Sequence, residues 1–397
     1  MKATLNRKAF VSALSACGCA IGKKTTIPIL AYVKILIEKH ENWNTCTISN
    51  TDLDVWIDNT VPVLAFSGDT IEICVLPSIM QKFLASSKAE NVDLEYMAGV
   101  PESDEIPCIP GKLKLAAGGS ISLGTMPTEN FPVLPEFGGE TYPVINLLET
   151  NSKAWIEMTS KVCYAVSDEE NRFTLPGFLL EVSDKVRMVA TDGHRLAILE
   201  RGLLPSGNKP DSLIPMRVYK HLKKILGKSD IPMTVMRTKH VTADYLIVVA
   251  GDLILVSRLL TGNFPEYKRV LTNYDMKPAV ADASKLIDGI DGVRHCADDK
   301  SHVIKIEFNS TSARFVAESP EKGKAELDVE CLTGGTHGVT VGFCYDYVLD
   351  FLRSLPVNDV VHIRCGKKAE KAGVGAWEFK SQADPGLTGI IMPMRLA

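Results

Sequence analysis

An acid, a base and a cation follow one another at Asp192, His194 and Arg195, within the stretch "VATDGHRLAIL". A carboxylate that orients a histidine can make the imidazole a general base, so one hypothesis is a hydrolase that uses Asp192 and His194, with Asp168 as a further acid. The sequence has neither a GxSxG nucleophile turn nor a GxxxxGK[ST] phosphate loop, and His194 has no second histidine at ligand spacing. The alternative is a tight turn through Asp192 and Gly193, in which His194 has a structural role.

The composition of the chain is that of a folded protein with several domains. Its 397 residues are 45% hydrophobic and 23% charged, and this length predicts two or three domains. The ten cysteines form no CxxC pair, so we expect free thiols and neither disulfides nor a metal site. No run of about 18 apolar residues occurs, which predicts that nothing spans a membrane. Residues 1–17 resemble a lipoprotein leader, but Ser12 and Ser15 interrupt the apolar stretch, and an amphipathic helix is the better interpretation.

Positive charge is concentrated in two windows of a chain whose formal net charge is -4. Residues 1–37 and 215–228 contain basic residues and no acidic one. The basic residues of interest in these windows are Lys8, Lys23, Lys24, Arg217, Lys220, Lys223 and Lys224. Either the windows are ordinary solvated helix faces, or they meet the phosphates of a nucleic acid.

Three segments of the chain begin alike, which indicates an internal repeat. They start at Leu5, Thr150 and Ala281, and each has a small polar residue, a lysine and then apolar residues at helical spacing. A second helix is predicted in each copy, and the segments between the helices alternate apolar and polar residues as strands do. The pattern predicts an α+β fold of three domains, which comprise residues 1–137, 138–272 and 273–397, with insertions at 98–119 and 366–377.

A series of short motifs runs nearly from end to end of the chain. In order, they are "TTIPIL", "TDLDV", "NFPVLP", "VATDGHRLA", "GNFPEYKRVL", "YVLDFL" and "IIMPMRL". Together they resemble the bacterial DNA sliding clamp family, the beta subunit of DNA polymerase III. The resemblance implies three repeated clamp domains per subunit, each with two helices and antiparallel sheets. It also implies a homodimeric ring whose helices line the hole.

The resemblance further implies a groove for short linear peptides of polymerases, the clamp loader and repair proteins. Leucine, valine, proline and methionine side chains would form its apolar floor, while arginine and histidine would fix polar groups at the rim. The residues that match the family's groove are Leu175, Thr191, Gly193, His194, Arg195, Leu196, Pro265, Arg269, Val270, Ile390, Met392, Pro393, Met394 and Arg395.

The same resemblance implies that the basic residues named above face duplex DNA without reading its sequence, and that Ile121 and Leu123 lie at the dimer edge. It implies no catalysis, no cofactor and no metal, a separate ATP-driven clamp loader, and a cytoplasmic, nucleoid-associated protein without a membrane partner. Two alternatives remain at this point. One is a peptide-binding scaffold that does not encircle DNA, and the other is the hydrolase.

Overall fold

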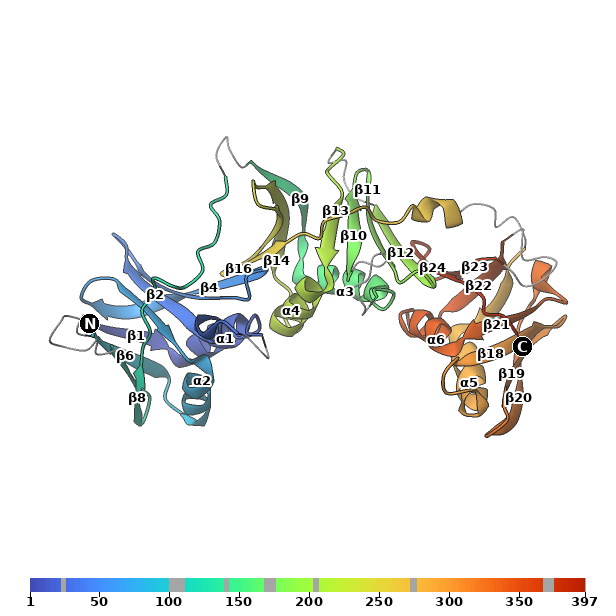
Figure 1. Cartoon of the computed structure of the whole chain (residues 1–397), viewed down its shortest axis with the longest axis horizontal. Helices are drawn as coiled ribbons and strands as arrows, with labels where there is room; N and C mark the ends of the chain where they lie inside the picture. The colour runs from blue at the N-terminus through green and yellow to red at the C-terminus, as the bar shows by residue number, and fades with distance from the viewer. Residues whose placement is uncertain are drawn as a thin grey trace. The chain divides into compact units, whose positions relative to one another are not determined.

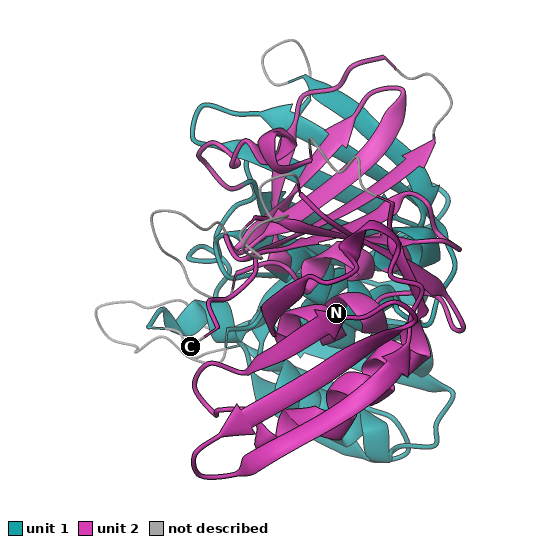
Figure 2. Ribbon diagram, turned by 90° about the vertical axis from the view of Figure 1, so that its right-hand side faces the viewer, with its two compact units in different colours: residues 1–156, 217–259 teal, residues 157–216, 260–397 magenta. Residues whose placement is uncertain are grey.

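A computed structural model describes residues 1–22, 26–99, 111–138, 143–167, 176–202, 207–271, 277–366 and 375–396. The chain divides into two compact units, shown in Figure 2. Unit 1 comprises residues 1–156 and 217–259, and unit 2 comprises residues 157–216 and 260–397. The predicted middle domain contributes to both units, and the two predicted domain boundaries stay predictions. Within the described ranges, no helix is long and apolar enough to cross a membrane.

Figure 1 labels many of the elements of unit 1. The elements are β1 (Lys2–Asn6), α1 (Arg7–Cys17), η1 (Pro28–Ala31), β2 (Val33–Lys39), β3 (Asn44–Thr51), β4 (Val55–Ser67), β5 (Ile71–Val75), α2 (Pro77–Ser86), β6 (Asn91–Met97), β7 (Lys112–Ala116), β8 (Ser120–Gly124), β9 (Val144–Asn151), β14 (Pro232–Lys239), β15 (Asp244–Ala250) and β16 (Leu253–Arg258). Two further helices, α3 (Ser152–Cys163) and α4 (Met216–Leu226), contain residues of both units.

Unit 2 contains the remaining elements. They are β10 (Gly177–Val182), β11 (Lys185–Thr191), β12 (Arg195–Gly202), β13 (Ser212–Pro215), η2 (Tyr267–Val270), β17 (Ala279–Asp282), α5 (Ala283–Val293), η3 (Arg294–Cys296), β18 (Val303–Phe308), β19 (Ser312–Ser319), β20 (Gly323–Glu330), η4 (Gly334–Thr336), β21 (Thr340–Cys344), α6 (Tyr345–Arg353), β22 (Val360–Cys365), β23 (Trp377–Ser381) and β24 (Leu387–Ile391). All the predicted helices form, each within a few residues of its expected start.

Unit 1 is built on a 12-stranded sheet with the strand order β8-β7-β6-β1-β4-β16-β15-β14-β9, from which β2, β3 and β5 branch. Helices α1 and α2 pack against each other, as Figure 1 shows. Phe10 and Leu14 are one helical turn apart on α1 and are fully buried, because this spacing puts both on one face. The Asn6 side chain caps α1 by accepting a hydrogen bond from the backbone N–H of Ala9. The second half of the segment 98–119, expected to be an insertion, supplies β7 and so belongs to this sheet.

Unit 2 has an 8-stranded sheet with the order β13-β10-β11-β12-β24-β23-β22-β17, and a 4-stranded sheet with the order β20-β19-β18-β21. Aromatic side chains fill its core. The ring centroid of Phe343 lies 5.6 Å from that of Trp377 and 5.8 Å from that of Phe379. In the large sheet β24 pairs with β12, from Arg195 opposite Ile391 to Leu199 opposite Leu387. This register brings Ile391, at the end of β24, next to the Asp192–Arg195 turn.

Several strands end a sheet in the described part of the chain, and β8 and β20 are two of them. β8 ends the path of the large sheet in unit 1, and β20 ends the small sheet in unit 2. β8 contains the half-buried Ile121 and Leu123, and β20 contains Leu327, which is an exposed large apolar side chain. An unpaired strand edge can accept another strand, so these two edges are candidates for association between chains.

Candidate functional site

The Asp192 side chain, in the turn between β11 and β12, is occupied by hydrogen bonds within the turn. Asp192 Oδ1 accepts hydrogen bonds from the backbone N–H groups of His194 and Arg195, both at 2.9 Å. Thr191 Oγ1 donates to the Arg195 carbonyl at 2.7 Å and accepts from the Gly193 N–H at 3.1 Å. Gly193 has a φ of +87°, a conformation that side chains with a Cβ rarely adopt. The turn is therefore a rigid structural feature.

Arg195 is held between carboxylates and aromatic rings. Its Nε donates to Asp192 Oδ2 at 3.0 Å, and its Nη1 donates to Asp350 Oδ2 at 2.5 Å. The guanidinium lies 4.6 Å from the centroid of the Tyr347 ring and 5.5 Å from that of Tyr164. Burial alone would lower the pKa of Arg195, but the two carboxylates raise it, so the cation stays charged.

His194 is exposed and is not oriented as a general base. Its ring stacks on Tyr347, with centroids 6.2 Å apart and planes at 15°. Asp192 bonds the backbone and Arg195 instead, and within the described residues no carboxylate hydrogen-bonds the His194 imidazole. Asp168 lies outside the described residues. A hydrolase needs a base fixed by a third group, and this geometry does not supply one.

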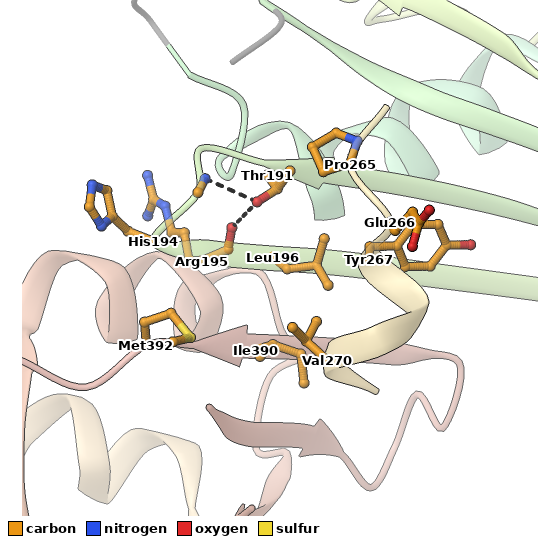
Figure 3. A pocket seen from close by; sticks show the side chains of 11 residues that line it. Thr191, His194, Arg195, Leu196, Pro265, Glu266, Tyr267, Val270, Ile390 and Met392 are labelled. Carbon is orange, nitrogen blue, oxygen red and sulfur yellow. Dashed lines mark hydrogen bonds between the residues drawn. The ribbon is translucent and has the colours of Figure 1, made fainter. Parts of the chain in front are cut away.

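A cavity of about 190 Å³ opens beside this turn, as Figure 3 shows. The β11–β12 hairpin forms one wall. Residues 265–270, which include η2, form the second wall, and β24 forms the third. Leu196, Val270, Ile390 and Met392 give it an apolar floor. The backbone N–H of Met392 donates to the His194 carbonyl at 2.9 Å, which ties the end of β24 to the hairpin. The full lining is Thr191, Gly193, His194, Arg195, Leu196, Pro265, Glu266, Tyr267, Val270, Ile390 and Met392.

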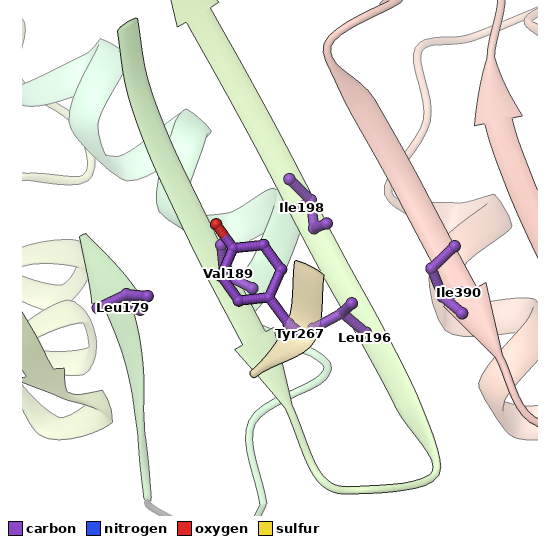
Figure 4. Close-up of a cluster of buried hydrophobic side chains, with 6 residues drawn as sticks. All are labelled: Leu179, Val189, Leu196, Ile198, Tyr267 and Ile390. Atoms are coloured by element: carbon purple, nitrogen blue, oxygen red, sulfur yellow. The ribbon is translucent and has the colours of Figure 1, made fainter. Parts of the chain in front are cut away.

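The floor of the pocket rests on a buried cluster that Tyr267 completes. Tyr267 packs with Val189, Ile198 and neighbouring apolar side chains from four strands, as Figure 4 shows. Its hydroxyl donates to Glu181 Oε2 at 2.7 Å, and burial together with this carboxylate raises the pKa of Tyr267. Arg187 Nη1 also donates to Glu181 Oε2, at 2.8 Å. The η2 turn is thereby anchored to the sheet, so the pocket is formed before any ligand arrives.

A second, wider hollow of about 590 Å³ adjoins the first. The two share Pro265, Glu266 and Tyr267 as lining residues, so they adjoin at this segment. Arg269 lines the second hollow and forms an exposed ion pair with Glu266.

The structure brings most of the predicted groove residues together, with some differences. Arg269 lines only the adjoining hollow, and Leu175 lies outside the described residues. Pro393, Met394 and Arg395 follow Met392 but do not line the cavity, and the Met394 N–H donates to the Gly342 carbonyl instead. Glu266 and Tyr267 line the cavity although they were not predicted. Their place inside the "FPEYKRV" string was the signal that could have found them.

The predicted DNA-facing residues have unequal environments. Lys8 on α1 is exposed, and so are the three lysines of α4, which are Lys220, Lys223 and Lys224. The opposite face of α4 is apolar and buried. Arg217 differs, because its Nη1 lies 2.9 Å from Asp54 Oδ2 and 3.6 Å from Asp52 Oδ2. Its charge is already compensated within the chain. Lys23 and Lys24 lie outside the described residues.

Comparison with known proteins places the chain in a family. Residues 149–266 match the model of the DNA polymerase III beta subunit central domain, and residues 268–395 match the model of its C-terminal domain. The chain is 26% identical to the beta sliding clamp of Pseudomonas aeruginosa and 25% identical to that of Escherichia coli K12, over the full length of both chains in each comparison.

Solved structures show the same fold. The crystal structure of the DNA polymerase III subunit beta from Pseudomonas aeruginosa has a TM-score of 0.85 at 24% identity, with each chain covered completely. The beta subunit from Thermotoga maritima has a TM-score of 0.82 at 23% identity, again with complete coverage of both chains. With its repeated units of helices and antiparallel sheets, the chain belongs to the beta sliding clamp family, the beta subunits of DNA polymerase III.

Proposed function

We propose that two copies of this chain close into a ring around duplex DNA and that the pocket beside Arg195 holds linear peptides of the polymerase and other replication proteins. The observation that carries the proposal is the preformed apolar cavity where the β11–β12 turn, η2 and β24 meet. A pocket with a rigid apolar floor and a few polar groups at its rim suits peptide anchors, and it contains no oriented base. The role is therefore to tether other proteins and involves no catalysis. We place it in the cytoplasm, at the nucleoid.

Ring closure would use the two unpaired strand edges. Adding β20 of one chain to β8 of another would pair both edges, and two-fold symmetry would repeat the contact on the opposite side. The apolar groups match, because Ile121 and Leu123 on β8 would meet the exposed Leu327 on β20 and the half-buried Ile287 on α5. Such a contact leaves no free edge at either site, so the dimer closes instead of growing into a fibre.

Contact with DNA would use exposed lysines. Lys8 on α1 and the three lysines of α4 are exposed, and in the described part of the chain no ion pair joins them to a carboxylate. Lysine ammonium groups meet phosphates as point charges and read no bases, so the binding is independent of sequence and weakens with salt. Loose contacts of this kind allow the ring to slide, while encirclement keeps it on the duplex.

The proposal is tested by loading the protein on a nicked circular plasmid with a clamp loader and ATP, and then cutting the plasmid once. A ring held by encirclement slides off the free ends, so bound protein should fall to background after the cut. Retention on the linear molecule would contradict the ring. In that case a peptide-binding scaffold that does not encircle DNA would be the better description, provided that peptide binding persists.

A further inference from the structure

Three side chains with metal-binding atoms converge in unit 2. They are His302, Cys344 and Asp346, and one ligand atom from each lies within 4.8 Å of the other two. His302 directly precedes β18, Cys344 ends β21, and Asp346 is in the first turn of α6. β18 pairs with β21 so that Val303 is opposite Cys344, and this register brings the histidine next to the cysteine.

The histidine is held in place by its backbone and by a stacked ring. The His302 N–H donates to the Asp298 carbonyl at 3.0 Å, and the His302 carbonyl accepts from the Tyr345 N–H at 2.9 Å. The Tyr345 ring stacks on the imidazole with centroids 4.9 Å apart and planes at 7°. These contacts direct Nδ1 at the Asp346 carboxylate, 2.5 Å from its Oδ2. The φ of His302 is +53°, which is rare for a residue with a Cβ, so the surrounding contacts must hold this conformation.

The cysteine lies at the start of a helix. Cys344 is the residue before α6, and burial, the main influence on its thiol, raises the pKa of Cys344 above the ordinary value, while the backbone N–H groups of Asp346 and Tyr347 act in the opposite direction. A helix N-terminus stabilises negative charge, and the thiolate is the form of cysteine that binds metals. Cys344 is buried, whereas the side chains of His302 and Asp346 are 38% and 45% exposed. Two of the three candidate ligands are therefore reached by solvent, and the sulfur lies below the surface.

We propose that His302, Cys344 and Asp346 bind one zinc ion per chain. Imidazole, thiolate and carboxylate are the ligand types that Zn²⁺ takes, and a thiolate disfavours Mg²⁺ and Ca²⁺. Three protein ligands leave a fourth position open to water. On binding, the imidazole would present an unprotonated Nδ1 to the ion and keep its proton on Nε2, the carboxylate would bind as the anion, and the thiol would release its proton to solvent. The ion would join the loop before β18 to the start of α6.

The test uses the full-length, untagged and metal-free dimer. Co²⁺ is added first, because it substitutes for Zn²⁺ and its thiolate complex has a charge-transfer absorption band. We expect that band to saturate at one Co²⁺ per chain and to disappear on addition of Zn²⁺. Calorimetry with Zn²⁺ alone should give the same stoichiometry. Zn²⁺ should also raise the melting temperature, because it binds the folded state selectively.

Variants assign the site. Cys344→Ser, His302→Gln and Asp346→Asn should each weaken Zn²⁺ binding by about tenfold or more, and Cys344→Ser should abolish the cobalt–thiolate band. Cys296→Ser is the matched control, since it removes a half-buried thiol outside the cluster and should leave binding unchanged. Melting curves in chelator show that each variant is folded. The proposal is overturned if the wild-type protein binds no Zn²⁺, if His302→Gln and Asp346→Asn bind it unchanged, or if Cys296→Ser removes the band.

Discussion

The Arg195 guanidinium lies 4.6 Å from the centre of the Tyr347 ring and donates to Asp350, one turn further along the same helix. One side chain thus joins the β11–β12 turn to α6. Its side chain is only 12% exposed, so water does little to replace these contacts when they are lost. The cation that suggested catalysis in the sequence has a structural role at the rim of the pocket.

Replacing Arg195 by alanine should lower the stability of unit 2. Asp192 and Asp350 would lose their partner, and Tyr347 would lose its stacked cation, so we expect a loss of about 1–3 kcal/mol in the free energy of unfolding. Urea unfolding measures it. Arg314→Ala is the control, because Arg314 forms an exposed ion pair with Asp328 that solvent screens, so its loss should cost much less stability than the loss of Arg195. Equal losses in the two variants would contradict the role given to Arg195.

Met392→Ala should weaken partner peptides. Met392 contributes an accessible apolar side chain to the cavity, and its truncation should cost about 1–2 kcal/mol of binding free energy. Fluorescence anisotropy with a labelled linear peptide of the host's replicative polymerase measures the affinity. Arg269→Ala should also weaken peptides that reach the second hollow. Met394→Ala is the control for Met392. The Met394 backbone N–H donates to the Gly342 carbonyl, and Met394 does not line the cavity. If Met394→Ala weakened the peptide as much as Met392→Ala, the cavity would not be the binding site.

Replacing Lys220, Lys223 and Lys224 together by alanine should lower the affinity for DNA. It should also make that affinity depend less steeply on salt concentration. Each lost phosphate contact lowers the slope of log affinity against log salt by about 0.9, so up to about three units are at stake. Binding of the dimer to a short duplex at several salt concentrations gives the slope. Arg217→Ala should change it less, because Asp54 and Asp52 already neutralise Arg217. The prediction fails if Arg217→Ala matches the effect of the triple variant.

Ile121→Lys combined with Leu123→Lys should convert the dimer to a monomer. The two lysines would place unpaired charge in the proposed contact of β8 with β20, where desolvation is costly. Light scattering should then give a mass near that of one 43.4 kDa chain, while the wild-type protein gives twice that mass. Leu64→Lys combined with Ile254→Lys serves as the control, because both are exposed apolar side chains on β4 and β16, which lie inside the sheet and not at its edge. A double variant that stays dimeric would show that β8 is not the interface.

Asp384 should make the stability of unit 2 sensitive to acid. Arg201 donates two hydrogen bonds to it and Lys161 donates a third, at 2.8, 2.7 and 3.0 Å. Burial alone would raise the pKa of Asp384, but these two cations outweigh it and hold the pKa below the ordinary value. The unfolded state therefore binds the proton more readily. The stabilisation is fully present above the ordinary aspartate pKa of about 3.9 and is lost as the pH falls through the lower folded value.

Asp384→Asn provides the measurement for this pH dependence. We compare the urea midpoints of the wild type and the variant from pH 7 to about pH 3. The wild type should be more stable at neutral pH, and the difference should shrink on acidification. A difference that stayed constant over this range would show that Asp384 contributes through packing and not through its charge.

Local patterns in the sequence predicted the helices, because a helix depends on residues close together in the chain, whereas the predicted pocket residues came from the resemblance to the sliding clamp family. The "TDGHR" and "IIMPM" strings each include residues of a pocket wall, and the β12–β24 register joins them. Contacts between distant residues could not be predicted. Arg217 pairs with Asp54, 163 residues earlier, and His302 meets Asp346, 44 residues later. In both cases the two residues meet only when the chain folds, so the sequence alone does not show that Arg217 is neutralised or that His302 lies beside Asp346.

The place of β24 between β12 and β23 has a consequence for synthesis of the protein. A ribosome makes Leu387–Ile391 and Met392 after it has made the other two walls of the pocket. Until that strand inserts between β12 and β23, the cavity has no third wall. A chain that stops before Leu387 therefore lacks this wall, and we expect it to hold no peptide in the cavity.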